Sequence, residues 1–474
     1  MPGMTYTKAL VGFAAFAVQV NAFWKMPCSS PVVVERADPI IDPGAISGHV
    51  HTILGSNAFN FTMDYASTQT ATCSTCKAFE DLSSYWVPTL YYHAENGSFI
   101  PVQQSGGALV YYLQRTDPKD PKLEEGLLAF PKDFRMIAGD MTRRNTSEAD
   151  APNGEAAASF VCLGLDGPKT PELPKQNCPG GLRAQINFPS CWNGVDKDSP
   201  DHKSHVAYPS RLDTGYCPDS HPHRFITLFY EVIWSVDPFK DMWYGDGQPF
   251  VFSYGDPTGT GYHGDFVNGW DVDVLQTAIN TCNSASGVVE ECGAFTFRKD
   301  DDMKACKALS RVDEPITGVL AALPGCNPVQ TGPETAQFDS SCTNVVKEIG
   351  DPIMPYTDMT KQGWKYVACA KDPQGQSRTL DGATSADTKD MTVDKCIKLC
   401  GDAGFTYAGL EYYTQCFCGD TLDASRMPTN GTMGDCSYPC SGDPTQLCGG
   451  GAQVAVYTKC AGGDCTNADV PDLF

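Results

Sequence analysis

The sequence predicts a mainly β protein, with an antiparallel β-sandwich or jelly-roll-like N-terminal domain that has long loops and a small disulfide-rich module after it. The first observation is the pattern of strands. Residues 109–113, 225–234 and 250–254 are β-branched and aromatic runs bounded by Gly, Pro, Asp or Ser, which is typical of strands. Helical periodicity is scarce, and residues 272–280 are the best candidate for a short helix. Many short strands between long polar loops favour a sandwich.

The second observation is the cysteine content. The chain has 22 cysteines, a number that persists in oxidising compartments rather than in the cytosol. They divide into twelve from Cys28 to Cys342, eight from Cys369 to Cys448, and two at Cys460 and Cys465. Each group is even, so each can close its own disulfides. The spacing does not decide which cysteines pair within the large group.

One close cysteine pair has a second interpretation. Cys73 and Cys76 have the spacing of a redox motif. Without a thioredoxin-like βαβ context we expect them to be a structural pair.

The N-terminus has the features of a signal peptide. Lys8 supplies a positive charge, residues 9–20 are apolar, and Ala22 closes a small-residue cleavage site. The apolar run is about half of the roughly 20 residues that a spanning helix needs. We therefore expect cleavage before Phe23, no membrane anchor, and a protein that is secreted and extracellular or associated with the cell wall.

Charge and glycosylation motifs agree with export. The net charge of −23 disfavours nucleic acid as a partner, because phosphates demand a basic surface. Four Asn-x-Ser/Thr motifs predict surface glycosylation. They begin at Asn60, Asn96, Asn145 and Asn430.

A change in composition divides the chain. Residues 327–361 are rich in Pro and Gly among small polar residues, which predicts a linker. The predicted organisation is therefore a signal peptide at 1–22, an N-terminal domain at 23–326, the linker at 327–361, a module at 362–458 and a C-terminal tail at 459–474.

The C-terminal module has a specific cysteine pattern. Its eight cysteines accompany a Gly-Trp pair at 363–364, an aromatic run at 405–413 and a Cys-Gly-Gly at 448–450. The eight are Cys369, Cys396, Cys400, Cys416, Cys418, Cys436, Cys440 and Cys448. A module of this size gains stability from disulfides. Zinc is disfavoured here, because the region has no His and export favours disulfides.

This pattern closely resembles the WSC domain, a module of fungal wall sensors and secreted enzymes. The resemblance implies binding of wall polysaccharide such as β-glucan. Exposed aromatic rings stack on sugar faces, and the candidates are Tyr407, Tyr412, Tyr413 and Tyr438. For any one of them, a place in the small core is the alternative.

The N-terminal domain contains all eight histidines, two pairs of which have His-x-His spacing. His49 and His51 form one pair, and His221 and His223 form the other. Residues two apart in a strand face the same side, so the pairs are a candidate site for a divalent metal such as Zn or Cu if their strands converge. Pro222 places the second pair at a strand entry or edge. The alternatives are a polar or catalytic cluster without metal and ordinary structural roles.

Acidic residues near these histidines offer a second chemistry. Glycoside hydrolysis needs two carboxyl groups facing each other across the scissile bond. Asp265 lies close to the histidine motifs in sequence, and Asp271 and Asp273 have the spacing to share a strand face. Acidic residues are plentiful in this chain, so the signal is weak.

Long motifs of the N-terminal domain resemble an uncharacterised family of secreted fungal proteins, the domain of unknown function DUF1996. They cover residues 23–28, 38–44, 47–51, 84–91, 187–194, 198–208, 217–223 and 265–270. The family brings no established activity or catalytic residues. The resemblance does imply that the histidine segments are hallmarks of the family.

These observations predict a wall-associated protein that acts on or binds polysaccharide, with hydrolysis as the favoured chemistry. The predicted site combines His49, His51, His205, His221 and His223 with Asp265. Imidazole can serve there as a metal ligand or as a general acid or base. The alternative is a non-catalytic wall-binding or adhesion protein.

Overall fold

The computed structural model describes residues 22–470 apart from 148, 338–344, 430 and 462–464. The predicted signal peptide therefore falls outside the described residues except for Ala22, as does the glycosylation motif at Asn430. Of the other motif asparagines, Asn96 is exposed, and Asn60 and Asn145 are half-buried. No helix in the described part of the chain is long and apolar enough to cross a membrane.

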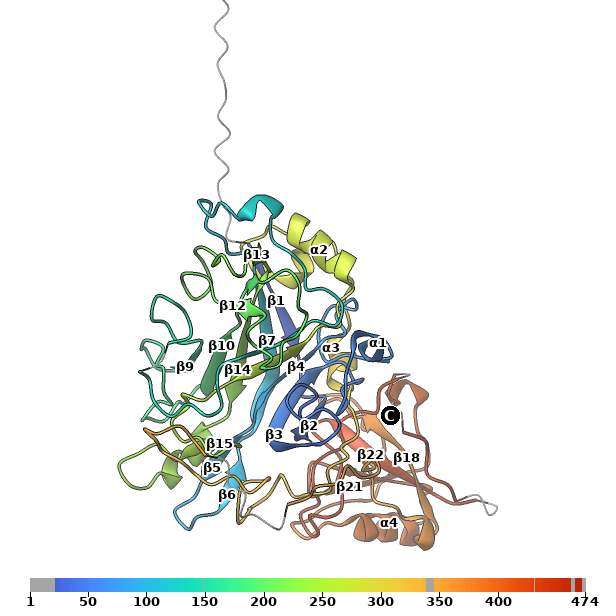
Figure 1. Ribbon diagram of the computed structural model, residues 1–474. Coiled ribbons are helices and arrows are strands. Elements are labelled where there is room, and N and C mark those ends of the chain that lie inside the picture. Colours follow the sequence, from blue (N-terminus) through green and yellow to red (C-terminus); the bar gives the residue numbers. More distant parts are fainter. Residues whose placement is uncertain (1–21, 148, 338–344, 430, 462–464, 471–474) are drawn as a thin grey trace, which may run out of the picture.

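Antiparallel sheets dominate the molecule, as predicted (Figure 1). The first sheet has the order β17-β1-β7-β14-β10-β9, and only its β1–β17 pair is parallel. Its strands are β1 (Phe23–Cys28), β7 (Gln104–Leu113), β9 (Ala158–Cys162), β10 (Leu182–Asn187), β14 (Thr227–Trp234) and β17 (Gly287–Val288). The predicted strands at 109–113 and 225–234 are in this sheet.

A second, five-stranded sheet faces the first and has the order β2-β3-β4-β16-β8. Its strands are β2 (Val33–Ala37), β3 (Ile46–Gly55), β4 (Ser84–Pro88), β8 (Arg135–Ala138) and β16 (Gly264–Val267). The main core fills the space between the two sheets, with Tyr85 of β4 packing on Tyr230 of β14 at 5.7 Å between ring centroids. The N-terminal domain is therefore a β-sandwich.

The second sheet is also covered on its outer face. There Trp86 and Ile53 join a separate apolar cluster with Phe59 and Cys306. Every residue of β4 and β16 is consequently buried. Any polar side chain on these strands has to find its partners inside the protein.

Smaller elements complete the N-terminal domain. Two three-stranded sheets contain β5 (Leu90–His93), β6 (Phe99–Pro101) and β15 (Phe250–Phe252), and β11 (Cys191–Trp192), β12 (Val206–Ala207) and β13 (His223–Arg224). The helices are α1 (Tyr65–Thr68), α2 (Val272–Thr281) and α3 (Asp300–Lys304), with 3-10 turns η1 (Leu123–Glu125), η2 (Asp237–Met242) and η3 (Val289–Glu291). The predicted helix at 272–280 is α2.

The C-terminal domain has one five-stranded sheet, in the order β18-β22-β20-β21-β19, and one long helix. Its elements are η4 (Thr360–Gln362), β18 (Trp364–Lys371), β19 (Ser385–Asp387), α4 (Val393–Asp402), β20 (Tyr407–Glu411), β21 (Gln415–Gly419), η5 (Ala424–Arg426) and β22 (Gln453–Lys459). Its eight predicted cysteines form the disulfides Cys369–Cys436, Cys396–Cys416, Cys400–Cys418 and Cys440–Cys448.

The disulfides between described residues stay within the three cysteine groups. Those of the N-terminal domain include Cys28–Cys76, Cys73–Cys306, Cys162–Cys178, Cys191–Cys217 and Cys282–Cys292, and Cys460–Cys465 closes the tail. The expectation that Cys73 and Cys76 pair with each other is wrong. Cys76 pairs with β1 and forms its disulfide with Cys28 there, whereas Cys73 forms its disulfide with Cys306.

The two domains touch directly beside Cys306. Met433 donates its backbone N–H to the carbonyl of Ala305 at 3.2 Å, and Lys307 pairs with Asp435 at 3.0 Å. Thr72 donates to the carbonyl of Gly431 at 2.9 Å. Figure 1 accordingly shows the C-terminal domain beside β2, β3 and α3.

The Cys73–Cys306 bond is expected to be the more important of two matched disulfides. It spans 233 residues, whereas Cys282–Cys292 spans 10. In the chain-entropy model, removing the disulfide that closes the longer loop lowers the free energy of unfolding by about 5 kcal/mol. Removing the one that closes the shorter loop lowers it by about 3 kcal/mol. Thermal unfolding of Cys73→Ala/Cys306→Ala should therefore occur below that of Cys282→Ala/Cys292→Ala. Equal melting temperatures would contradict this account.

Candidate functional site

Polar side chains gather on the outer face of the second sheet. Residues paired across neighbouring strands point to the same face, and the register aligns Ile53, Trp86, Asp265 and Ile137 in one row. Ile53 and Trp86 belong to the outer cluster, so Asp265 faces the same way. His51 lies two residues before Ile53 in β3 and shares that face.

His263 is brought to this face by the same register. Asp265 is opposite Trp86, so continuing the antiparallel pairing two residues back places His263 opposite Pro88. Pro88 is also paired with His51 on its other side. His51 and His263 therefore flank one proline, with their ring centroids 5.8 Å apart. His49 completes the group, at 4.2 Å from the ring of His51 and 5.1 Å from that of His263.

Backbone carbonyls fix the orientation of two of these rings. Nδ1 of His51 donates to the carbonyl of Ala37 at 3.0 Å, and Nδ1 of His263 donates to that of Gly261 at 3.1 Å. A carbonyl only accepts, so in both rings Nε2 carries the free lone pair. Nε2 of His263 lies 3.1 Å from Nε2 of His49, so His49 supplies the hydrogen between them.

Burial keeps all three imidazoles neutral. It lowers the pKa of His51 and that of His263 to about 3. It also lowers the pKa of His49 well below its ordinary value, and the neighbouring His51 and His263 add to that effect. Nε2 of His51 is buried and has no hydrogen-bond partner among the described residues. The cluster thus has one imidazole nitrogen from each ring that could bind a metal ion, and these atoms lie within 4.8 Å of one another.

Two carboxyl groups border the histidines. Asp38, Asp265 and His51 place potential ligand atoms within 4.8 Å of one another. Oδ1 of Asp38 accepts from the N–H groups of Ile40 and Ile41 at 2.9 and 3.0 Å. Neither buried carboxyl oxygen of Asp265 has a partner within the part of the chain that the structure describes. Burial raises the pKa of both carboxyl groups, and the charge of Asp38 raises that of Asp265 further.

A cavity of about 590 Å³ opens onto this cluster. His49, His263, Asp38 and Asp265 line it, whereas His51 lies behind them. Its rim includes the segment 345–347, which is held by the Nη2 of Arg36 donating to the carbonyl of Val346 at 2.8 Å. The cavity therefore has a polar floor that a small ligand or a sugar unit can approach.

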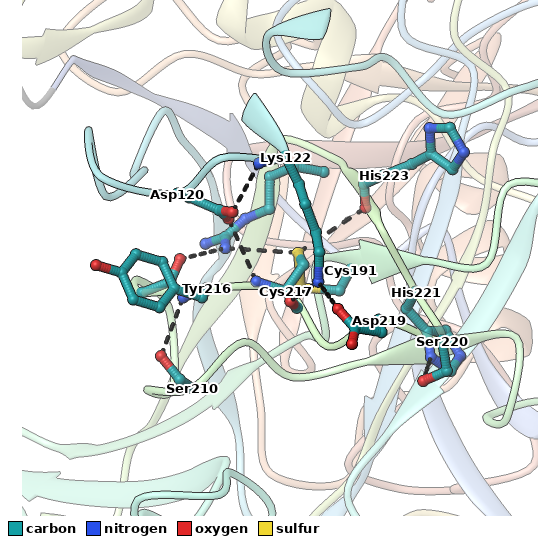
Figure 2. Close-up of a disulfide and its surroundings, with 12 residues drawn as sticks. Asp120, Lys122, Cys191, Ser210, Tyr216, Cys217, Asp219, Ser220, His221 and His223 are labelled. Atoms are coloured by element: carbon teal, nitrogen blue, oxygen red, sulfur yellow. Dashed lines mark hydrogen bonds and ion pairs between the residues drawn. A yellow bond between two sulfur atoms is a disulfide. The ribbon is translucent and has the colours of Figure 1, made fainter. Parts of the chain in front are cut away.

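The second His-x-His pair does not join this site, so the expected convergence of the two pairs is wrong. His223 begins β13 in a different sheet, and its Nδ1 contacts Glu125 at 2.9 Å. Nε2 of His221 lies 3.0 Å from the carbonyl of Ser204. In Figure 2 the two side chains point away from each other, beside the Cys191–Cys217 disulfide. Pro222 does precede a strand entry, as expected.

Three other predicted residues also lie apart from the cavity. His205 is buried with both ring nitrogens occupied, at 2.8 Å from Oγ of Ser199 and 2.8 Å from the carbonyl of Arg135. Asp271 and Asp273 do not share a strand face, because Asp271 is the N-cap of α2 and accepts from the N–H of Asp273. These roles are structural.

Sequence reasoning missed two members of the site, Asp38 and His263. A signal for His263 was present, since His263 and Asp265 repeat the two-residue spacing of His49 and His51 where β16 begins. Asp38 directly follows β2 and carried no comparable signal.

Three tyrosines of the C-terminal domain form a cluster in which Tyr412 and Tyr413 are exposed and Tyr438 is half-buried. Tyr413 stacks on Tyr438 with ring centroids 4.5 Å apart, and Tyr412 lies 5.4 Å from Tyr413. Tyr412 and Tyr413 occupy the β20–β21 turn with positive φ angles of 48° and 70°. Bulky residues rarely adopt this backbone, and such strain is concentrated at functional positions. Tyr407 does not belong to the cluster; it packs against an apolar patch that contains Val454.

Comparison with known proteins identifies both domains. Residues 38–270 match the model of the domain of unknown function DUF1996, and residues 366–450 match that of the WSC domain. Many disulfides together with a WSC domain fit an extracellular protein.

Similar proteins share only part of their length with this chain. A putative fungistatic metabolite of Chaetomium globosum is 38% identical over 96 residues, which are 20% of this chain and 41% of that protein. A WSC domain-containing protein of Arthroderma benhamiae is 37% identical over 123 residues, 26% of this chain and 15% of that protein. Kremen protein 2 of Mus musculus is 37% identical over 98 residues, 20% of each chain.

Protonation of His51 is expected to destabilise the fold. Its pKa is about 3 in the folded chain and about 6.5 in an unfolded one, so the unfolded chain binds the proton first as the pH falls. In EDTA, the unfolding free energy of the wild type should fall relative to that of His51→Asn by up to about 1.4 kcal/mol per pH unit below pH ~6.5. Unfolding curves at several pH values measure this, with His221→Asn as a control that follows the wild type. A constant difference between wild type and His51→Asn would contradict it.

Proposed function

We propose that this chain, a DUF1996 domain joined to a WSC domain, is a secreted, fungal wall-associated protein that binds β-glucan-like polysaccharide and acts on it in the N-terminal cavity. The observation that carries the proposal is the cavity floor, where buried histidines and two carboxyl groups meet. Imidazoles with a lowered pKa and carboxyl groups with a raised pKa are components of general acid–base chemistry. The WSC domain supplies proximity to the polymer.

The tyrosine cluster supports the binding half of the proposal. Tyr412 is 55% exposed and Tyr413 is 37% exposed, so both rings can be reached by a ligand. Flat, exposed rings held next to each other fit the apolar faces of successive sugar units, while the hydroxyl groups bind the sugar's edge. The WSC-named relatives favour a wall polymer as the ligand.

The carboxyl groups favour hydrolysis as the reaction. Potential ligand atoms of Asp38 and Asp265 lie within 4.8 Å of each other, close to the ~5–5.5 Å between the carboxyl groups of retaining glycosidases. Their environments differ, because Asp38 accepts two backbone hydrogen bonds and Asp265 accepts none from the described residues. Such an asymmetry separates an ionised group from a protonated one.

A non-catalytic wall-binding protein is the second candidate. One observation favours it: the tyrosine cluster is complete within the C-terminal domain and takes no residue from the cavity. Binding without turnover needs no more than this surface.

Replacing the turn tyrosines separates binding from folding. Tyr412→Gly/Tyr413→Gly removes two rings and also relieves the positive φ angles, which glycine adopts freely. We expect binding to insoluble β-1,3-glucan to weaken by at least about 10-fold, or ~1.4 kcal/mol, without a lower melting temperature. Sedimentation with the polymer measures binding, and the exposed Tyr216→Ala of the other domain is the control. Unchanged sedimentation of the double variant would contradict the proposal.

Activity is tested by the release of reducing sugar from β-1,3-glucan, chitin and xylan. Asp265→Asn keeps the size of the side chain but removes the acid, so release should fall at least about 100-fold. Asp219→Asn, at a surface ion pair with Lys122, should leave release unchanged. Wild-type protein that sediments with glucan but releases sugar from none of the polymers establishes the second candidate instead.

A further inference from the structure

The histidine cluster has the geometry of a metal centre. We propose that His49, His51 and His263 bind one Zn²⁺ ion whose remaining coordination position faces the cavity. This inference goes beyond the proposed function, because it concerns the ion alone and holds whether or not polysaccharide binds.

The distances between the donor atoms fit a tetrahedral ion. Zinc lies about 2.0–2.1 Å from imidazole nitrogen, which places two nitrogen ligands ~3.3–3.4 Å apart. The Nε2 atoms of His49 and His263 are 3.1 Å apart, and the donor atoms of all three rings lie within 4.8 Å of one another. In the zinc-bound form His49 carries its hydrogen on Nδ1, so that the ion replaces the hydrogen bond between these two nitrogens.

The orientation of the rings is prepared by groups outside the site. Metal-binding histidines typically donate their other ring N–H to a backbone carbonyl or carboxylate, which fixes the tautomer. His51 and His263 both do so, through Ala37 and Gly261. Both therefore direct an unprotonated nitrogen into the cluster.

Unsatisfied buried atoms give an independent indication of a missing ligand. His51 is 0% exposed and Asp265 is 1% exposed, yet Nε2 of His51 and both carboxyl oxygens of Asp265 lack partners among the described residues. Buried polar groups in native proteins normally have a hydrogen-bond partner, so these exceptions indicate a ligand that binds here. A zinc ion bound to Nε2 of His51 satisfies that ring, and Asp265 is placed beside it.

The chemistry of the donors selects the ion. Calcium and magnesium prefer oxygen ligands, whereas three neutral imidazoles suit zinc. Three of the neighbouring groups, His49, His263 and Asp265, line the cavity. Three protein ligands with a fourth position open to a cavity is the arrangement of catalytic rather than structural zinc sites.

The nearby charges are compatible with a cation. Arg36 and Lys203 line the same cavity, but Arg36 pairs with Glu314, and Lys203 donates to the carbonyl of Gly139 at 2.6 Å. Asp38, which accepts two backbone N–H groups, and Asp140 line the cavity as well and offer negative charge to a cation.

The test is metal loading of the full chain. Protein is stripped with EDTA, loaded with Zn²⁺, separated from free metal and assayed by elemental analysis, with about one ion per chain expected. His49→Gln/His51→Gln should bind Zn²⁺ at least about 10-fold more weakly. The matched control is His221→Gln/His223→Gln, which removes the other His-x-His pair and should load like the wild type.

A second measurement needs no variant, in case the buried substitutions prevent folding. Co²⁺ loaded in place of Zn²⁺ should give the intense visible absorption of a tetrahedral site, and Zn²⁺ should raise the melting temperature of stripped protein. Wild-type protein that retains no Zn²⁺ overturns the proposal, as does equal loading of both double variants. Retention of Fe²⁺ or Mn²⁺ in preference to equimolar Zn²⁺ overturns the choice of ion, because both normally bind nitrogen ligands more weakly than zinc does.

Discussion

The burial of one sheet on both faces is the constraint on which the candidate site depends. The sheet β2-β3-β4-β16-β8 has the sandwich core on one side and a second apolar cluster on the other. Polar residues placed on it are almost fully buried, even where they line the cavity. His51 and Asp265 lie there all the same, and burial lowers the pKa of the imidazole and raises that of the carboxyl group. The chemistry of the site is a consequence of where the sheet lies.

The sequence was most informative where a pattern is local. The strand runs at 109–113 and 225–234, the helix at 272–280 and the eight cysteines of the C-terminal domain all lie where they were expected. Such features depend on alternation, capping and spacing within a few residues, so one sequence is sufficient to find them.

Only the His49 and His51 part of the site could be predicted, because the rest depends on contacts between strands that are far apart in the sequence. Strand periodicity places His49 and His51 on one face, but nothing local says which other strand will be their neighbour. That choice is made by β4, which carries Pro88 between His51 and His263. The pair at His221 and His223 has the same spacing and ends in a different sheet. Spacing therefore predicts a shared face but not a shared site.

The Cys73–Cys306 disulfide has a mechanical consequence. A pull on the C-terminal domain travels back along the chain to residues 307–337, which contact the N-terminal domain through hydrogen bonds such as the two that the backbones of Leu320 and Phe99 exchange at 2.8 Å. Hydrogen bonds give way under load before covalent bonds do, so the load is then taken up at Cys306. There a covalent bond passes it to Cys73, beside the end of β3, where Thr75 donates to the carbonyl of Gly55 at 2.8 Å. Tension on an anchored molecule is thus borne by the strand that carries His49 and His51.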